Sequence, residues 1–168
     1  MKFFKCVLVL IGLVLFISSM NLSGKYIHKV EKLRTEINDD DLLANAEYYL
    51  IKENVPIALS LSTSKNESNL KKYAVHVNRD GTIDRGYFQL NSKSFKLKDY
   101  FNTNDNVKNG IGYIAWCIQN SGNSIENGLM SYNAGIGNFY RGNIPNSTKQ
   151  YVKNILIQKE KYEKIMNA

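Results

Sequence analysis

Glu67 is the carboxyl group of this 168-residue chain that is best placed to do chemistry. It follows Pro56 and the apolar residues 57–61, a pattern that predicts a buried helix with proline in its first turn. A carboxylic acid at the end of such a helix is expected to have a raised pKa, because apolar surroundings disfavour its charged form. Held neutral near pH 7, Glu67 is suited to protonate a leaving oxygen as a bond to that oxygen breaks.

A second carboxyl group, Asp84, lies shortly after an Asp80-Gly81 dipeptide that is typical of a tight turn. Short β-prone runs flank this dipeptide, so residues 73–92 predict a small hairpin or three-stranded sheet. If the hairpin folds back over the end of the helix, Asp84 approaches Glu67. Two carboxyl groups about 5–5.5 Å apart are the arrangement of a retaining glycosidase. Alternatively, Asp84 binds substrate or orders the turn.

The elements that must position these residues are mostly helical. Acidic residues at 39–41 precede apolar positions at helical spacing, which predicts a helix start. The same periodicity predicts further helices over residues 107–118, 125–132 and 148–166. Helices arranged around one small sheet indicate a single domain of the α+β class.

Four short motifs follow one another along the chain at domain-sized spacing. They are Asn66-Glu67-Ser68, Asp84-Arg-Gly-Tyr-Phe-Gln89-Leu-Asn91, Asn109-Gly110-Ile-Gly-Tyr113-Ile114 and Met130-Ser-Tyr132-Asn133-Ala-Gly135. In this order they resemble the motifs of soluble lytic transglycosylases and goose-type lysozymes, over about residues 40–165. The resemblance implies a lysozyme-like α+β fold, mostly helical, with a small β-hairpin or sheet flanking an active-site cleft.

The same resemblance implies roles for individual residues. Glu67 is expected to be the catalytic acid, acting on the β-1,4 bond between N-acetylmuramic acid and N-acetylglucosamine of peptidoglycan. Ser68, Gln89, Tyr132 and Asn133 are the expected substrate-binding residues, with Gln89 on a strand that passes the cleft and the Tyr132 hydroxyl near Glu67. For three of them a structural role is the alternative: Gln89 as an outward strand residue, Tyr132 as a core aromatic and Asn133 as a helix cap.

Two chemical outcomes remain open for this site. If the protein acts as a lytic transglycosylase, Glu67 acts alone, first as acid and then as base, and the product carries a 1,6-anhydromuramoyl ring. The segment around Asp84 also resembles the hairpin of chicken-type lysozymes, in which an aspartate at this place is the second catalytic carboxylate. A hydrolytic lysozyme that uses Glu67 and Asp84 is therefore the alternative, and a non-catalytic peptidoglycan-binding protein is a third interpretation.

The N-terminus predicts export. Residues 1–23 combine Lys2 and Lys5 with an apolar run, typical of a signal peptide or, if uncleaved, a membrane anchor. Residues 24–39 are expected to form a linker or N-terminal extension, and residues 40–168 the lysozyme-like domain. The net charge of +7 suits an anionic wall, so we expect a location in the periplasm or cell envelope.

The chain gives little sign of a cofactor. Asn78, Asp80 and Gly81 fit part of a calcium loop, but His76 and Tyr87 stand where it needs hard ligands, so no metal site is expected. Cys117 is expected to be a buried structural thiol. Peptidoglycan is the expected partner, and a secretion, flagellar or conjugation apparatus is a further one by analogy. Nucleic acid is disfavoured by the export segment, and contact with a membrane is expected only through an uncleaved N-terminus.

Overall fold

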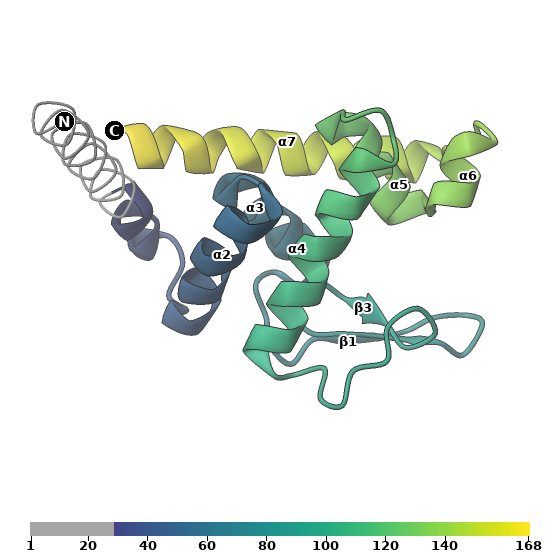
Figure 1. The fold of residues 1–168 in the computed structure, drawn as a ribbon, viewed down its shortest axis with the longest axis horizontal. Coiled ribbons are helices and arrows are strands. Elements are labelled where there is room, and N and C mark those ends of the chain that lie inside the picture. Colours follow the sequence, from purple (N-terminus) through teal and green to yellow (C-terminus); the bar gives the residue numbers. More distant parts are fainter. Residues whose placement is uncertain (1–28) are drawn as a thin grey trace, which may run out of the picture.

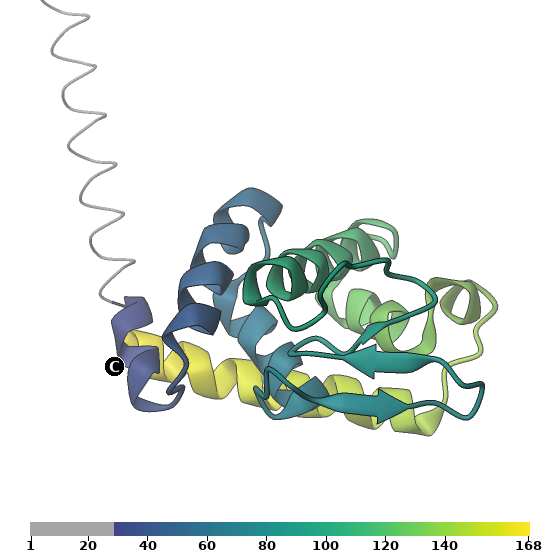
Figure 2. The same ribbon diagram turned by 90° about the horizontal axis from the view of Figure 1, so that it is seen from below.

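A computed structural model describes residues 29–168 of the chain, and the expected export segment lies outside that range. The described part is mostly helical with one small antiparallel sheet, which confirms the predicted α+β class (Figure 1). In the turned view of Figure 2 the strands lie along one side of the helices. The elements are η1 (Lys32–Thr35), α2 (Asp40–Glu53), α3 (Ile57–Ser68), β1 (Val75–Val77), β2 (Ile83–Arg85), β3 (Leu90–Asn91), α4 (Thr103–Gln119), α5 (Ile125–Ala134), α6 (Ile136–Tyr140) and α7 (Asn146–Asn167).

Polar side chains fix the starts of the long helices. Asp39 precedes α2 in an extended conformation, and its carboxylate accepts a hydrogen bond from the Leu42 amide (2.9 Å). Asn102 does the same for α4 by accepting from the Asp105 amide (3.0 Å). These side chains satisfy amides that have no partner within the helix, and each such cap stabilises a helix by about 1 kcal/mol.

Helix α3 runs through the core, and its residues from Ile57 to Ser64 are all buried. Several of these are polar: Ser62 donates to the Ala58 carbonyl (2.6 Å) and Thr63 to the Leu59 carbonyl (2.9 Å), whereas the buried Ser64 hydroxyl has no hydrogen-bond partner among the described residues. A hydroxyl that bonds back to the preceding turn carries its own partner into the core. The buried helix therefore tolerates a polar sequence and delivers Glu67 at its last turn.

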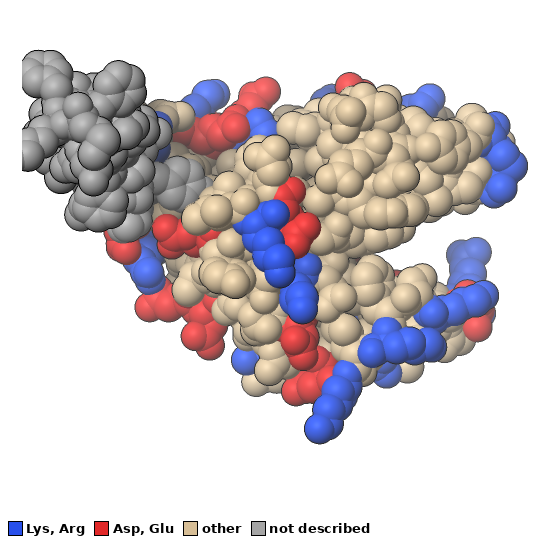
Figure 3. Space-filling view, viewed as in Figure 1, with Lys and Arg blue, Asp and Glu red and all other residues tan. Residues whose placement is uncertain are grey.

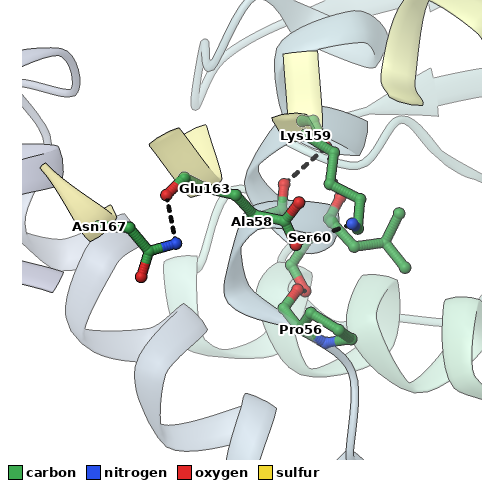
Figure 4. Close-up of polar contacts among 8 residues, drawn as sticks. Pro56, Ala58, Ser60, Lys159, Glu163 and Asn167 are labelled. Carbon is green, nitrogen blue, oxygen red and sulfur yellow. Dashed lines mark hydrogen bonds and ion pairs between the residues drawn. The ribbon is translucent and has the colours of Figure 1, made fainter. Parts of the chain in front are cut away.

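Helix α7 packs along α3. Figure 4 shows Lys159 and Glu163 of α7 beside Pro56 and Ala58 at the start of α3. Lys159 and Glu163 form an ion pair one helical turn apart (2.8 Å). Because it lies against α3 for much of its length, α7 is able to place side chains near both ends of that helix.

The segment before α2, expected as a linker or N-terminal extension, is packed where the structure describes it. Val30, Leu33 and Ile37 are buried in the core. Lys161 of α7 pairs with Glu36 (2.7 Å). These contacts need a helix more than a hundred residues away in sequence, so local patterning could not reveal them.

The three strands form an antiparallel sheet in the order β1, β2, β3. The predicted turn at Asp80-Gly81 is confirmed, with Gly81 at φ +79°, a conformation that favours glycine. The pairing places His76 opposite Asp84, and Asp84 opposite Asn91. Directly opposed residues of adjacent strands point to the same face, so these three polar side chains share one face of the sheet.

The sequence predicted that Gln89 lies on a strand, and this prediction is wrong. Gln89 belongs to the turn of residues 86–89 that joins β2 to β3, and its φ of +45° is outside the extended region. Gly86 begins the turn at φ +79°, and a side chain there would collide with Asn106. The β-prone residues Tyr87 and Phe88 are buried in the core instead of extending a strand.

Cys117 is buried and free, as expected. Within residues 29–168, no group of three or more His, Cys, Asp or Glu side chains is arranged to hold a metal ion. Among the helices that the structure describes, none has the length and apolar character needed to cross a bilayer.

Candidate active site

A cavity of about 1060 Å³ lies between the sheet and the helices α4 and α5. Figure 3 shows a hollow opening between two lobes of the surface at the side where the sheet faces α5 and α6. Glu67 reaches the cavity from the last turn of α3, and the polar face of the sheet supplies Asp84. Gln89, Tyr132 and Asn133 also line it. The structure thus brings together five of the six residues expected at the site.

Glu67 is the carboxyl group of this cavity whose pKa is raised. Burial raises the pKa of its carboxyl from 4.5 to about 7. A hydrogen bond from the Tyr151 hydroxyl to Glu67 Oε1 (2.5 Å) opposes this increase, and the negative charge of Asp84 adds to it. Loss of solvation is the largest of these effects, as expected for a carboxyl at the end of a buried helix. A group with this pKa exchanges protons readily near neutral pH.

Tyr151 was not identified as a site residue from the sequence. It lies on α7, where its spacing fits the apolar side of the helix, and only the packing of α7 against α3 brings its hydroxyl to Glu67. The periodicity of the helix predicts which side is buried but not what a buried hydroxyl contacts. The short bond to Oε1 fixes the orientation of the Glu67 carboxyl group.

Asp84 is held by two amide side chains on the sheet. Asn78 Nδ2 donates to Asp84 Oδ2 (2.8 Å), and Asn91 Nδ2 donates to Oδ1 (2.7 Å). Both asparagines line the same cavity. Each carboxylate oxygen therefore has a fixed partner, and the pair of amides orients Asp84 while it acts on Glu67 through its charge.

Gln89 supports the loop that carries it. Its Nε2 donates to the carbonyls of Gly86 (2.9 Å) and Ala74 (3.2 Å), which ties the turn to the residue before β1. The side chain still lines the cavity. Since both amide protons are used within the protein, its carbonyl oxygen is the part available to a bound ligand.

Ser68 lies behind Glu67 and is not part of the cavity wall. Its hydroxyl lies within hydrogen-bonding distance of the Tyr87 carbonyl (2.9 Å) and the Ser64 carbonyl (3.1 Å), and it accepts from the Lys71 amide (3.2 Å). These bonds connect the end of α3 to the turn of residues 86–89. The structure therefore gives Ser68 a positioning role in place of the expected contact with substrate.

Tyr132 and Asn133 line the cavity at the end of α5. The Tyr132 hydroxyl donates to the Phe88 carbonyl (2.9 Å) and so anchors the turn that carries Gln89, and it lies close enough to Glu67 for the two groups to interact through charge. Burial, followed by the charge of Glu67, raises the pKa of Tyr132, which keeps the phenol neutral. Asn133 Oδ1 accepts from Thr148 Oγ1 (2.7 Å), which connects α5 to α7.

Asn106 of α4, a residue with no role predicted from the sequence, also supports the turn. Its Oδ1 accepts from the Phe88 amide (3.1 Å), and its Nδ2 donates to the carbonyls of Arg85 (3.1 Å) and Tyr100 (3.0 Å). Gly110 lets the same helix approach closely, because a Cβ there would lie 2.2 Å from Phe88 Cγ. This contact explains the glycine at position 110 of the third motif.

The assembled site combines one acid whose pKa is near neutrality, one fixed carboxylate and several amides around a large open cavity. These groups are the ones that enzymes use to cleave glycosidic bonds by proton transfer. The chain matches the transglycosylase SLT domain over residues 45–155, and it belongs to this family. The family places the chain among lysozyme-like proteins with a lytic transglycosylase-type function directed at peptidoglycan.

Proposed function

We propose that the protein is a lytic transglycosylase that cleaves the β-1,4 bond between N-acetylmuramic acid and N-acetylglucosamine. Glu67 is the general acid and base. The observation that carries the proposal is the raised pKa of Glu67, about 7, on a carboxyl that lines the cavity and is oriented by Tyr151. A carboxyl group of this kind is protonated in part at neutral pH and is also able to take the proton back.

In the first step Glu67 gives its proton to the glycosidic oxygen as the bond from that oxygen to C1 of the muramoyl residue breaks. The oxygen of the substrate's own acetamido group closes on C1 and holds the positive charge. In the second step the Glu67 carboxylate accepts the proton of the C6 hydroxyl while O6 attacks C1 and displaces the acetamido oxygen. The products are a free C4 hydroxyl and a 1,6-anhydro ring, and Glu67 is protonated again.

A hydrolytic lysozyme is the second candidate function, and the environment of Asp84 supports it. Asn78 and Asn91 hold this carboxylate on the cavity wall, and its charge is felt at Glu67. A carboxylate fixed in this manner is suited to attack C1 or to stabilise a positive charge there. In that mechanism a water molecule attacks C1 in the second step, and the products carry reducing ends.

A single digestion experiment separates the two candidates. Purified peptidoglycan is digested with the wild-type protein and with Asp84→Asn, and the fragments are identified by mass. The transglycosylase proposal expects muramoyl ends that are lighter by one water molecule, produced by both proteins. Reducing ends from the wild type, lost in Asp84→Asn, would instead establish the hydrolase. If neither protein releases fragments, the remaining interpretation is a non-catalytic peptidoglycan-binding protein.

We also propose that the protein acts outside the cytoplasm, in the periplasm or cell envelope, where it opens the wall for a secretion, flagellar or conjugation apparatus. The support is the basic and apolar pattern of residues 1–23 together with the peptidoglycan substrate of the family. Fractionation of cells that produce the full chain, or a chain without residues 1–23, tests this location. Retention of both forms in the cytoplasm would contradict it.

A further inference from the structure

The described surface holds one aromatic cluster that begins in the cavity and extends beyond it. Tyr113 of α4 lines the cavity and contacts the rings of Phe95 and Tyr132, with centroid distances of 5.4 and 5.1 Å. One turn further along α4, Trp116 stacks on Tyr113 with the planes 13° apart and the centroids at 5.8 Å. Trp116 is 43% exposed and is not part of the cavity wall.

The geometry points to a sugar-stacking subsite at Trp116, which holds a further residue of the glycan strand next to the part bound in the cavity. This inference rests on the proposed function, because it extends the same cleft. One face of a pyranose ring presents C–H bonds and packs against a flat aromatic ring, while its hydroxyl groups stay in water. The parallel Tyr113–Trp116 pair leaves an exposed aromatic surface in direct continuity with the cavity.

The charge of the surrounding surface favours a carbohydrate as the occupant. Glu126 is the only Asp, Glu, Lys or Arg residue in the sequence from 109 to 140, which contains the end of α4, α5 and α6. Figure 3 shows this lobe almost entirely without charged side chains, while basic side chains gather on the opposite lobe across the opening. An uncharged surface with aromatic rings suits the polyol backbone of a glycan.

A second exposed aromatic side chain lies beside the end of the same helix. Tyr140 of α6 is 69% exposed, and its hydroxyl donates to the carbonyl of Asn120 just beyond α4. This bond holds α6 against the end of α4. Tyr140 therefore lies on the same lobe as Trp116.

Trp116 is the only tryptophan of the chain, so its fluorescence reports directly on the proposed subsite. The full chain with Glu67→Gln, which prevents cleavage, is titrated with a β-1,4-linked hexamer of N-acetylglucosamine and with soluble peptidoglycan strands. Stacking of a sugar is expected to shift the tryptophan emission in a saturable manner. The measurement needs no substitution at position 116, so it remains decisive even if such variants fold poorly.

Affinity measurements by calorimetry complete the test. Trp116→Ala in the Glu67→Gln background is expected to weaken binding of the hexamer by about five- to tenfold, whereas Trp116→Phe restores most of the affinity. Tyr48→Ala is the matched control, since Tyr48 is an exposed aromatic residue on α2 that does not line the cavity. Its affinity for the hexamer should equal that of the parent protein.

Two results would overturn the subsite. One is that calorimetry detects binding of the hexamer but the tryptophan emission does not change, and that Trp116→Ala binds the hexamer as tightly as the parent Glu67→Gln protein does. That outcome leaves the chemistry of Glu67 intact. The other is that the Glu67→Gln protein binds neither the hexamer nor the soluble strands, although the wild-type protein digests peptidoglycan. Failure of the proposed function itself would appear separately, as wild-type protein that releases no fragments.

Discussion

Glu67 experiences opposing influences on its charge. Its buried position favours the neutral acid, while the hydrogen bond from Tyr151 favours the carboxylate. Because burial is the larger effect, the pKa lies near 7, where both the protonated and the ionised form are populated at neutral pH. A single residue that must give and then retake a proton needs such a balance.

Tyr151→Phe tests this balance through the pH dependence of activity. The hydroxyl lowers the pKa of Glu67, so its removal should raise that pKa. Since the first step needs protonated Glu67, kcat/KM should fall above about pH 7 in the wild type, and the fall should move to higher pH in the variant. Its maximal rate should also decrease because the carboxyl is less well oriented. A falling limb that stays in place would contradict the role given to Tyr151.

Glu67→Gln should change stability in a pH-dependent way. The pKa of Glu67 is about 7 in the folded state and 4.5 in the unfolded state. The contribution of protonated Glu67 to the free energy of unfolding is therefore fully present below pH 4.5 and is lost as the pH rises through 7. The loss amounts to about 3 kcal/mol. Urea denaturation should therefore find Glu67→Gln more stable than the wild type at pH 8 and similar to it at pH 4. Glu126→Gln, at an exposed position, controls for the change in net charge.

At the scale of elements, the site depends on the turn of residues 86–89 and on the helices that hold it. The Tyr132 hydroxyl and the Asn106 side chain both bond to the Phe88 backbone, and Ser68 bonds to Tyr87. Helices α3, α4 and α5 thus meet at one short turn. Any change in their packing should reach Gln89, which ends the turn.

Gly110→Ala and Gly112→Ala form a matched pair for this packing on α4. A Cβ at position 110 would overlap Phe88, while nothing lies within 4 Å of one at position 112. Gly110→Ala should destabilise the protein by about 1–3 kcal/mol and lower activity through the displaced turn. Gly112→Ala should instead stabilise it by up to about 1 kcal/mol, because alanine favours the helix. Equal effects of the two substitutions on unfolding would refute the proposed contact.

Features that depend on local sequence were predicted well. The apolar periodicity located the helices, the Asp80-Gly81 dipeptide located the hairpin, and Glu67 appeared at the end of a buried helix. The errors concern features set by distant contacts. Gln89 looked like a strand residue because its neighbours are β-prone, but Asn106 and Gly110 on α4 impose a turn.

At the scale of the whole molecule, charge is distributed unevenly around the cleft. Residues 69–101, which contain the sheet, carry seven Lys or Arg residues against three Asp residues. On the face that Figure 3 shows, the middle of the opposite lobe is without charged side chains. An anionic wall polymer should therefore be attracted mainly to the sheet side, while the sugar rings meet the aromatic side.

Salt should weaken this attraction. An increase in ionic strength from about 0.1 to 1 M shortens the screening length from about 10 to 3 Å. We expect the rate of digestion of intact, anionic peptidoglycan to fall several-fold over this range at subsaturating substrate. Binding of the uncharged N-acetylglucosamine hexamer should change little in the same buffers. Equal salt dependence of the two ligands would argue against a role for the basic lobe.

In the proposed mechanism Glu67 performs the proton transfers that cleave the glycan strand. The most direct measurement compares the fragments released from purified peptidoglycan by the wild type and by Glu67→Gln, identified by mass. The wild type should release fragments with anhydromuramoyl ends, and Glu67→Gln should be slower by about 10²–10⁴-fold. Release of the same fragments by both proteins at comparable rates would show that Glu67 is not the catalytic acid.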